Sequence, residues 1–288
     1  MIRLGAAAVE ALTLRDLVEA YRRSPAWTER RESKRKDEPR IAYWIDSLGG
    51  LPITDITTAL IARHRDDLSR RFAASTVAGY LAALSAIYKA AGEHYDGVAN
   101  PVKVRRPRNR LVRLRYLSDA EFERLIDAAG GVSDRLLAMV LAALSCGARC
   151  SELMSIRWQD LDLERGTAVL RPDDAKTGHL RTLRFRGAAL EALRQLPRIS
   201  VWLWGGGTRP PAWPRKQWDE ARAAAALEDF RWHDLRHTSA TWLAMQGAGG
   251  PEVQMHLGHR SLAITNKYVH LAAGQRSDIG PMLVPRYY

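Results

Sequence analysis

The chain contains little cysteine and no long apolar run. Cys146 and Cys150 are its two cysteines in 288 residues, too few for a disulfide framework. Because they lie four residues apart in a predicted helix, we expect small buried side chains and not a redox pair. The most apolar stretch, residues 136–143, is too short to span a bilayer, and no secretory signal opens the sequence. These absences predict a cytoplasmic protein without membrane contact.

Acidic residues are in the minority. The chain has 32 Asp and Glu against 44 Lys and Arg, a formal net charge of +12 with a pI near 10.1. Both halves of the sequence share this surplus. It favours a polyanionic partner such as DNA, because basic residues that neutralise phosphates release condensed counterions. A charge that serves solubility alone is the alternative.

Two sequence patterns that handle phosphates are also missing. No cluster of carboxylates suits a pair of magnesium ions, and no GxxxxGK[ST] loop occurs. If this protein reacts with a nucleic-acid backbone, its own side chains must supply the nucleophile, the proton donor and the cations. We therefore expect neither a metal ion nor any other cofactor.

Residues 1–100 are predicted to form a helical domain. Helical periodicity runs through residues 13–24, 41–48, 57–71 and 75–91, with Ser75 as the expected N-cap of the last helix. No strand pattern interrupts these helices, and their outer faces are basic. A small bundle of this kind can hold a duplex through its phosphates. A helical interaction module with a solvated, charged face is the alternative.

Residues 101–115 are predicted to be a basic interdomain linker. Two prolines disfavour a helix here, and the segment contains no acidic residue. Such a run is often just a solvated connection, but between two basic domains it would lie along the DNA backbone. The residues expected to contact DNA are Lys103, Arg105, Arg106, Arg108 and Arg110.

Residues 116–288 are predicted to form a second, mostly helical domain with a small antiparallel sheet and a C-terminal tail. Ser118 and Glu121 form a capping-box pattern at the start of its first helix. Strands are expected at residues 166–171 and 180–185, with Lys176 in the turn between them. Further helices are expected near residues 133–145, 188–195, 215–227, 232–246, 251–256 and 262–269.

The second domain contains side chains suited to breaking a phosphodiester bond. Tyr is one of the nucleophiles that can hold phosphorus covalently, and Arg can bind two phosphate oxygens at once. His233 and Arg236 are three residues apart on a predicted helix, so they share a face and can address one phosphate.

These residues resemble the active-site region of the tyrosine site-specific recombinases, the phage integrase family. The resemblance lies in GARCSEL around Arg149, HDLRHT with His233 and Arg236, LGH ending at His259, and Tyr268 nine residues later. It covers residues 118–271 closely and residues 13–91 weakly. It implies a mainly α, two-domain protein that clamps duplex DNA between a core-binding domain and a catalytic domain.

The family's chemistry implies a role for each matching residue. Tyr268 would attack the scissile phosphate to form a 3′-phosphotyrosyl link and free a 5′ hydroxyl. Arg149 and Arg236 would hold the phosphate oxygens, and His259 would assist by a hydrogen bond. Because the covalent link conserves the bond energy, neither ATP nor a metal is required.

The remaining roles concern protons, support and assembly. His233 would act in an acid/base relay at the tyrosine, Lys176 would protonate the leaving oxygen, and Glu152 would support Arg149 or nearby backbone. The family implies a homotetramer on two DNA sites that passes through a Holliday junction, and a monomer free in solution. Residues 272–288 are a candidate segment for docking on a neighbouring protomer.

Three other interpretations are open from the sequence. A type IB topoisomerase-like relaxing enzyme shares this chemistry but not the pairing of two sites. A DNA-binding protein that has lost cleavage is a second possibility. A zinc site is a third, with ligands chosen from His233, His237, His256, His259, Cys146 and Cys150.

Overall fold

The computed structural model folds into two compact units, Met1–Val112 and Arg113–Tyr288. The structure describes residues 11–29, 34–95, 97–107, 114–171, 180–259, 261–272, 275 and 277–284, with backbone alone at residues 34–36, 263 and 264. In these parts of the chain, every helix is too short or too polar to cross a bilayer. Each unit has its own apolar core.

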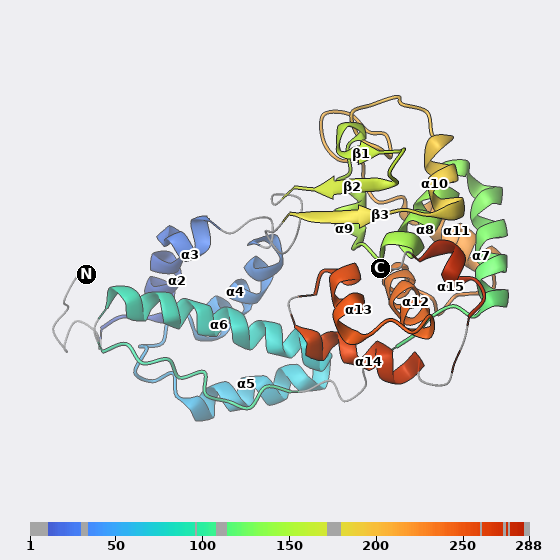
Figure 1. Cartoon of the computed structure of the whole chain (residues 1–288). Coiled ribbons are helices and arrows are strands. Elements are labelled where there is room, and N and C mark those ends of the chain that lie inside the picture. Colours follow the sequence, from blue (N-terminus) through green and yellow to red (C-terminus); the bar gives the residue numbers. More distant parts are fainter. Residues whose placement is uncertain are drawn as a thin grey trace. The chain divides into compact units, whose positions relative to one another are not determined.

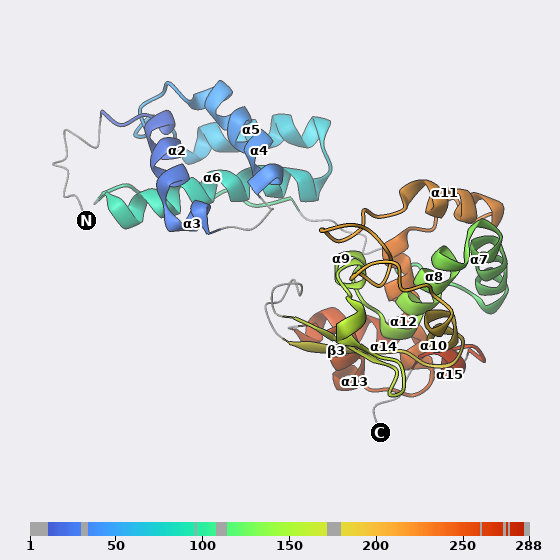
Figure 2. The ribbon, with the colours of Figure 1, turned by 90° about the horizontal axis from the view of Figure 1, so that it is seen from above.

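The described part of the first unit is helical (Figure 1). Its helices are α2 (Leu14–Arg23), α3 (Pro25–Thr28), α4 (Lys34–Leu48), α5 (Thr58–Arg71) and α6 (Ala74–His94). The long helix α6 packs against α2, α4 and α5 (Figure 2). Trp44 on α4 is fully buried in this core and its indole N–H donates to the Tyr80 carbonyl oxygen at 2.9 Å.

One expectation for the first unit is corrected by the structure. Helix α6 begins at Ala74 with Ala73 as its N-cap, so Ser75 lies inside the first turn and does not cap it. The charged stretch before residue 41 could be a loop or the start of a helix by its sequence, and in the structure helix α4 begins at Lys34. It continues through Pro39, although proline in a helix removes one backbone hydrogen bond.

The described start of the predicted linker, residues 101–107, packs on the first unit. Val102 and Val104 contact its core, and the Thr58 hydroxyl donates to the Pro101 carbonyl oxygen at 2.9 Å. Lys103, Arg105 and Arg106 are exposed. The segment therefore turns its apolar side chains inward and its cations outward. Arg108 and Arg110 lie outside the described residues.

The second unit combines helices with one antiparallel sheet in the order β1-β2-β3 (Figure 1). Its elements are α7 (Asp119–Val132), α8 (Asp134–Cys146), α9 (Cys150–Met154), η1 (Trp158–Asp160), β1 (Leu161–Asp162), β2 (Thr167–Leu170), β3 (Arg181–Arg184), α10 (Gly187–Arg194), α11 (Arg215–Ala224), α12 (Trp232–Met245), α13 (Gly250–Leu257), α14 (Leu262–Ala272) and α15 (Gly280–Leu283). The Ser118–Glu121 capping box is confirmed at the start of α7. The short strand β1 was not predicted.

Helices α8 and α12 form the centre of the second unit. They pack against each other, and α12 also contacts α13 and α14. Helix α8 is almost entirely buried and ends at Gly147, which adopts a left-handed conformation with φ +57°. This turn leads directly to Arg149 at the start of α9, so a buried helix positions a predicted site residue.

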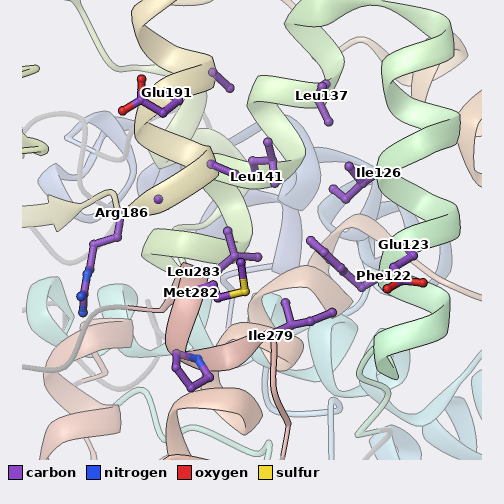
Figure 3. A pocket seen from close by; sticks show the side chains of 14 residues that line it. Phe122, Glu123, Ile126, Leu137, Leu141, Arg186, Glu191, Ile279, Met282 and Leu283 are labelled. Carbon is purple, nitrogen blue, oxygen red and sulfur yellow. The ribbon is translucent and has the colours of Figure 1, made fainter.

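The last described residues fold back onto their own unit. Leu283 of α15 is buried, and its carbonyl oxygen accepts a 2.7 Å hydrogen bond from the Ser145 hydroxyl. A cavity of about 840 Å³ lies beside this segment. Figure 3 shows its mainly apolar lining, which includes Phe122 and Ile126 of α7, Leu141 of α8 and Met282 of α15. None of the predicted site residues lines it.

Candidate active site

The described site residues gather around the start of α9, the end of α13, the first turns of α12 and the middle of α14. Arg149 precedes α9, His233 and Arg236 lie on α12, His259 follows α13 and Tyr268 lies on α14. Arg149 and Arg236 are close enough for their charges to act on both His233 and His259. The fold therefore brings together five residues that are separated by up to about 120 positions in the sequence. Lys176 lies outside the described residues.

Arg149 is held by Glu152, one turn further along the chain. Arg149 Nη1 lies 2.6 Å from Glu152 Oε1, and the Arg149 backbone N–H donates to Glu152 Oε2 at 3.0 Å. Glu152 is 1% exposed, whereas the Arg149 side chain is 23% exposed. A buried carboxylate thus anchors a partly accessible guanidinium, which can still offer N–H donors to an anion.

Arg236 is almost completely buried, with 2% of its surface exposed. Its two terminal nitrogens donate to the carbonyl oxygens of Gly147 and Leu257, the latter at 2.7 Å. These contacts join α12 to the turn before Arg149 and to the end of α13. Burial, together with the nearby charges of Arg181 and Arg149, lowers the pKa of Arg236 to about 9. The side chain therefore stays positively charged at neutral pH.

The hydroxyl of Tyr268 is bound by His237, a residue that the sequence indicated only as a candidate zinc ligand. Tyr268 Oη lies 2.6 Å from His237 Nδ1, and Tyr268 is 2% exposed. Burial raises the pKa of Tyr268 to about 12, so its phenol is protonated. Burial and nearby cations lower the pKa of His237 to about 3, so its ring is neutral. With its ring proton on Nε2, the neutral imidazole can accept the phenol hydrogen bond at Nδ1.

Two further histidines of the site are neutral and hydrogen-bonded. His259 Nδ1 lies 3.0 Å from the hydroxyl of Thr265, a buried residue on the same helix as Tyr268. His256 Nε2 lies 2.7 Å from the Ser239 hydroxyl. Burial is the main cause that lowers the pKa of His259 to about 4 and that of His256 to about 3. Neutral imidazoles can donate hydrogen bonds to phosphate without adding another charge to the cluster.

Comparison with known proteins assigns the chain to a family. A model of the phage integrase family matches residues 115–275, more than half of the chain. The chain belongs to the phage integrase family. The integrase of Salmonella phage P22 is 28% identical over 299 residues, covering 88% of this chain and 76% of that relative. The tyrosine recombinase XerD of Pseudomonas aeruginosa is 28% identical over 278 residues, covering 89% and 91%.

Solved structures of phage integrase family proteins share the fold. A lambda integrase tetramer bound to a Holliday junction matches with a TM-score of 0.72 at 20% identity, over 95% of this chain and 82% of that chain. The expected fold class, mainly helical with a small antiparallel sheet in the second of two domains, is confirmed. So is the expectation of a tyrosine recombinase, an enzyme that transfers DNA strands.

Two cations that lie close to the predicted site residues were missed in the sequence. Lys267 Nζ lies 4.9 Å from the centre of the Tyr268 ring. Arg181 on β3 has a side chain that is 10% exposed and bonds to Glu152. The alternation in RTLR was a usable signal, because it puts Arg181 on the same strand face as the buried Leu183. Lys267 had no comparable signal beyond its position next to the tyrosine.

The residues considered for zinc have other surroundings. His237 and His256 each bond to a hydroxyl, as described above. Cys146 is buried and Cys150 half-buried, and burial raises the pKa of both thiols to about 11. No group of three potential metal ligands occurs among the residues that the structure describes.

Proposed function

We propose that this chain cleaves and rejoins DNA at specific recombination sites with Tyr268 as the nucleophile. Tyr268 Oη forms a bond to the scissile phosphorus while the bond from phosphorus to the 5′ oxygen breaks. Lys176 supplies the proton that the leaving 5′ oxygen takes up. The 3′-phosphotyrosyl link keeps the energy of the broken bond, so a 5′ hydroxyl from another strand can reverse the step without ATP.

The observation that carries this proposal is the setting of the Tyr268 hydroxyl. It lies in a buried cluster with Arg149 and Arg236, inside the region that matches the family model. Guanidinium groups at fixed positions stabilise the negative charge that develops on phosphate oxygens in the transition state. We assign Arg149 and Arg236 to those oxygens and His259 to a supporting hydrogen bond, with Glu152 anchoring Arg149.

The proton of Tyr268 needs an acceptor before attack. His237 Nδ1 already bonds to the hydroxyl, and the His233 and His237 rings lie 5.0 Å apart between centroids. We propose that His237 Nδ1 accepts the proton of the Tyr268 hydroxyl as the oxygen attacks and that His233 completes the acid/base relay. Positioned proton transfer of this kind contributes about 10²–10⁴ in rate, so both histidines are testable.

DNA binding is assigned to both units and to the basic segment between them. The exposed Lys103, Arg105 and Arg106 support this assignment, and Arg108 and Arg110 are proposed with them. The active assembly is proposed to be a homotetramer that passes through a Holliday junction, as in the lambda integrase structure, and to form from monomers on DNA. Its free thiols fit a reducing cytoplasm, with DNA of the nucleoid as the substrate.

The test is covalent capture. The protein is incubated with sheared DNA of its source genome in EDTA and denatured, and the protein-linked fragments are sequenced to define the site. A nicked duplex built on that site then traps the intermediate. The wild type should give a denaturation-resistant adduct, Tyr268→Phe none, and His237→Leu an adduct that forms about 100-fold more slowly.

The controls separate the competing functions. Tight DNA binding without any adduct would identify a non-cleaving DNA-binding protein. An adduct accompanied by relaxation of supercoiled plasmid, without exchange between two plasmids that carry the site, would identify a topoisomerase-like enzyme. Equal adduct yields from the wild type and Tyr268→Phe would contradict Tyr268 as the nucleophile.

A further inference from the structure

Arg181 occupies an unusual place for an arginine. It is the first residue of β3, on the strand face that also carries the buried Leu183. Its side chain is 10% exposed, and its Nε is buried without a hydrogen-bond partner. Burying a guanidinium costs free energy unless its surroundings compensate for the lost water. The contacts of Arg181 show where this compensation comes from.

Arg181 connects three segments that carry the proposed catalytic residues. Its Nη1 lies 2.8 Å from Glu152 Oε2 on α9. Its Nη2 donates to the His256 carbonyl oxygen on α13 and, at 3.4 Å, to the carbonyl oxygen of Cys146 at the end of α8. The guanidinium of Arg181 therefore joins the segment before Arg149 to the segment before His259. An arginine can do this because its planar group presents several N–H donors at once.

Arg181 also packs closely against the turn that leads to His259. A Cβ atom added to Gly258 would lie 2.9 Å from both Cδ and Nε of Arg181. Gly258 adopts a left-handed conformation with φ +65° at the end of α13. The side chain of Arg181 thus fills the space where another residue's side chain would be, and it restricts the backbone beside His259.

Arg181 and Arg149 share the carboxylate of Glu152, and each arginine contacts one of its two oxygens. Glu152 Oε1 lies 2.6 Å from Arg149, while Oε2 lies 2.8 Å from Arg181. Burial acts to raise the pKa of Glu152, but the charge of Arg181 and the contacts with Arg149 outweigh it and lower the pKa. The carboxylate is therefore ionised, and a single negative charge faces two guanidinium groups. Without Arg181, it would face Arg149 alone.

We propose that Arg181 is a positioning residue that shares Glu152 with Arg149, so that Arg149 stays oriented but keeps its positive charge available for the scissile phosphate. The inference rests on the proposed function, in which Arg149 binds that phosphate. A carboxylate paired with Arg149 alone would neutralise it and compete with the phosphate for its donors. Arg181 prevents this competition and fixes the turn before His259.

The experiment compares Arg181→Met with Arg184→Met, which removes the same charge from the exposed face of the same strand. Adduct formation is measured in single turnovers on the nicked duplex at saturating DNA, and DNA affinity is measured separately. Both variants should lose the same affinity. Arg181→Met should in addition form the adduct about 100-fold more slowly, because small displacements of catalytic groups cost about this factor. Arg181→Lys should recover part of the rate.

A double-variant cycle distinguishes charge sharing from a structural role. Glu152→Gln removes the charge that would capture Arg149 in Arg181→Met. If the two substitutions acted independently, their fold-losses in adduct rate would multiply. The double variant Arg181→Met/Glu152→Gln should instead form the adduct at least about fivefold faster than that product predicts. Losses that simply multiply would overturn the proposal. If Arg181→Met is unfolded at the assay temperature, Arg181→Gln takes its place in the same cycle, because glutamine also removes the charge but keeps a hydrogen-bond donor.

The outcomes separate this inference from the proposed function. A wild-type adduct together with equal rates for Arg181→Met and Arg184→Met would refute the role of Arg181 and leave Tyr268 cleavage intact. No adduct with the wild type would refute both. A rate loss in Arg181→Met that Glu152→Gln relieves would support the charge-sharing role.

Discussion

The two units differ in what they bury. Among the described residues of the first unit, Ser24 is the buried polar side chain, and the rest of the core is apolar. The second unit buries a larger set of polar and charged side chains: Ser145, Glu152, Ser155, Asp234, Arg236, Thr238, Ser239, Thr241, His256 and Thr265. The second unit also has the larger apolar core, so its buried polar groups are an addition to that core and not a replacement for it.

This difference separates stability from chemistry. Burying polar and charged groups is costly or at best neutral for folding, so their concentration in one unit indicates a role other than stability. In the second unit, the buried Arg236 acts on Tyr268 and the buried Glu152 bonds to Arg149, whereas the basic side chains of the first unit's linker segment face solvent. The first unit exposes its linker cations to solvent, whereas the second unit fixes Arg236 in its interior.

The largest expected effect comes from removing a buried charge. Arg236→Met should lower adduct formation by about 10²–10³-fold, because a fixed donor to the phosphate is lost. Its free energy of unfolding should change by no more than about 2 kcal/mol, since relief of the buried charge offsets two lost hydrogen bonds. Single-turnover trapping and urea denaturation measure the two quantities.

The matched variant in the first unit should behave in the opposite way. Leu84→Ala removes a fully buried side chain of α6 and should cost about 2–5 kcal/mol of unfolding free energy. At saturating DNA and full folding, its adduct rate should equal that of the wild type. Large stability losses from Arg236→Met, or a slower chemical step in Leu84→Ala, would remove the distinction between the units.

Acid should destabilise the second unit more than the first. Burial, with Arg181 and Arg236 nearby, lowers the pKa of His256 from 6.5 to about 3. Below pH 6.5, His256 is protonated in the unfolded state but stays neutral in the folded state. The folded state therefore loses stability as the pH falls from 6.5 toward 3. At about 1.4 kcal/mol per pH unit, this one group costs roughly 2 kcal/mol between pH 6.5 and 5.

Peptide-resolved hydrogen exchange at pH 7 and pH 5, corrected for the intrinsic rates, measures this difference. Protection of α12 and α13 should fall at pH 5, while protection of α6 should fall less. His256→Gln should reduce the pH dependence of the second unit. Equal losses of protection in both units would show that the buried histidines do not control acid stability.

The smallest effect should be equal in the two units. Thr13 caps α2 with Asp16 as its partner, and Ser118 caps α7 with Glu121 in the same arrangement. Thr13→Ala and Ser118→Ala should each cost about 1 kcal/mol of unfolding free energy. Urea denaturation of both variants checks this. A much larger cost at Ser118 would mean that its contribution extends to the Arg115–Glu121 ion pair.

Local patterns predicted most of the helices but not their ends. The capping box at Ser118 could be read because all its parts lie within four residues. The start of α4 could not, because Pro39 disfavours a helix that nevertheless runs through it. The prediction of Ser75 as the N-cap of α6 was also wrong. Serine is a favoured capping residue, but the helix starts at Ala74, one residue earlier. The two-residue strand β1 is too short for any periodic signal.

For the site, motif order predicted which residues meet but not how they bond. Arg236 donates to Gly147, 89 positions away, and Tyr268 bonds to His237, 31 positions away. Such contacts depend on the packing of α8, α12 and α14, which no local pattern records. The sequence favoured His233 as the tyrosine's partner, whereas the hydroxyl contact in the structure is with His237. This contact adds His237 to the acid/base relay that we propose for Tyr268 and His233.

The turn at Gly147 limits how this protein could evolve or be engineered. Its φ of +57° disfavours any side chain, and an added Cβ would lie 2.9 Å from both His256 and Leu257. A library that randomises the region around Arg149 to change DNA specificity would therefore lose nearly every clone altered at Gly147, although the residue has no side chain to contact DNA. A selection should keep Gly147 constant and randomise the exposed basic residues instead.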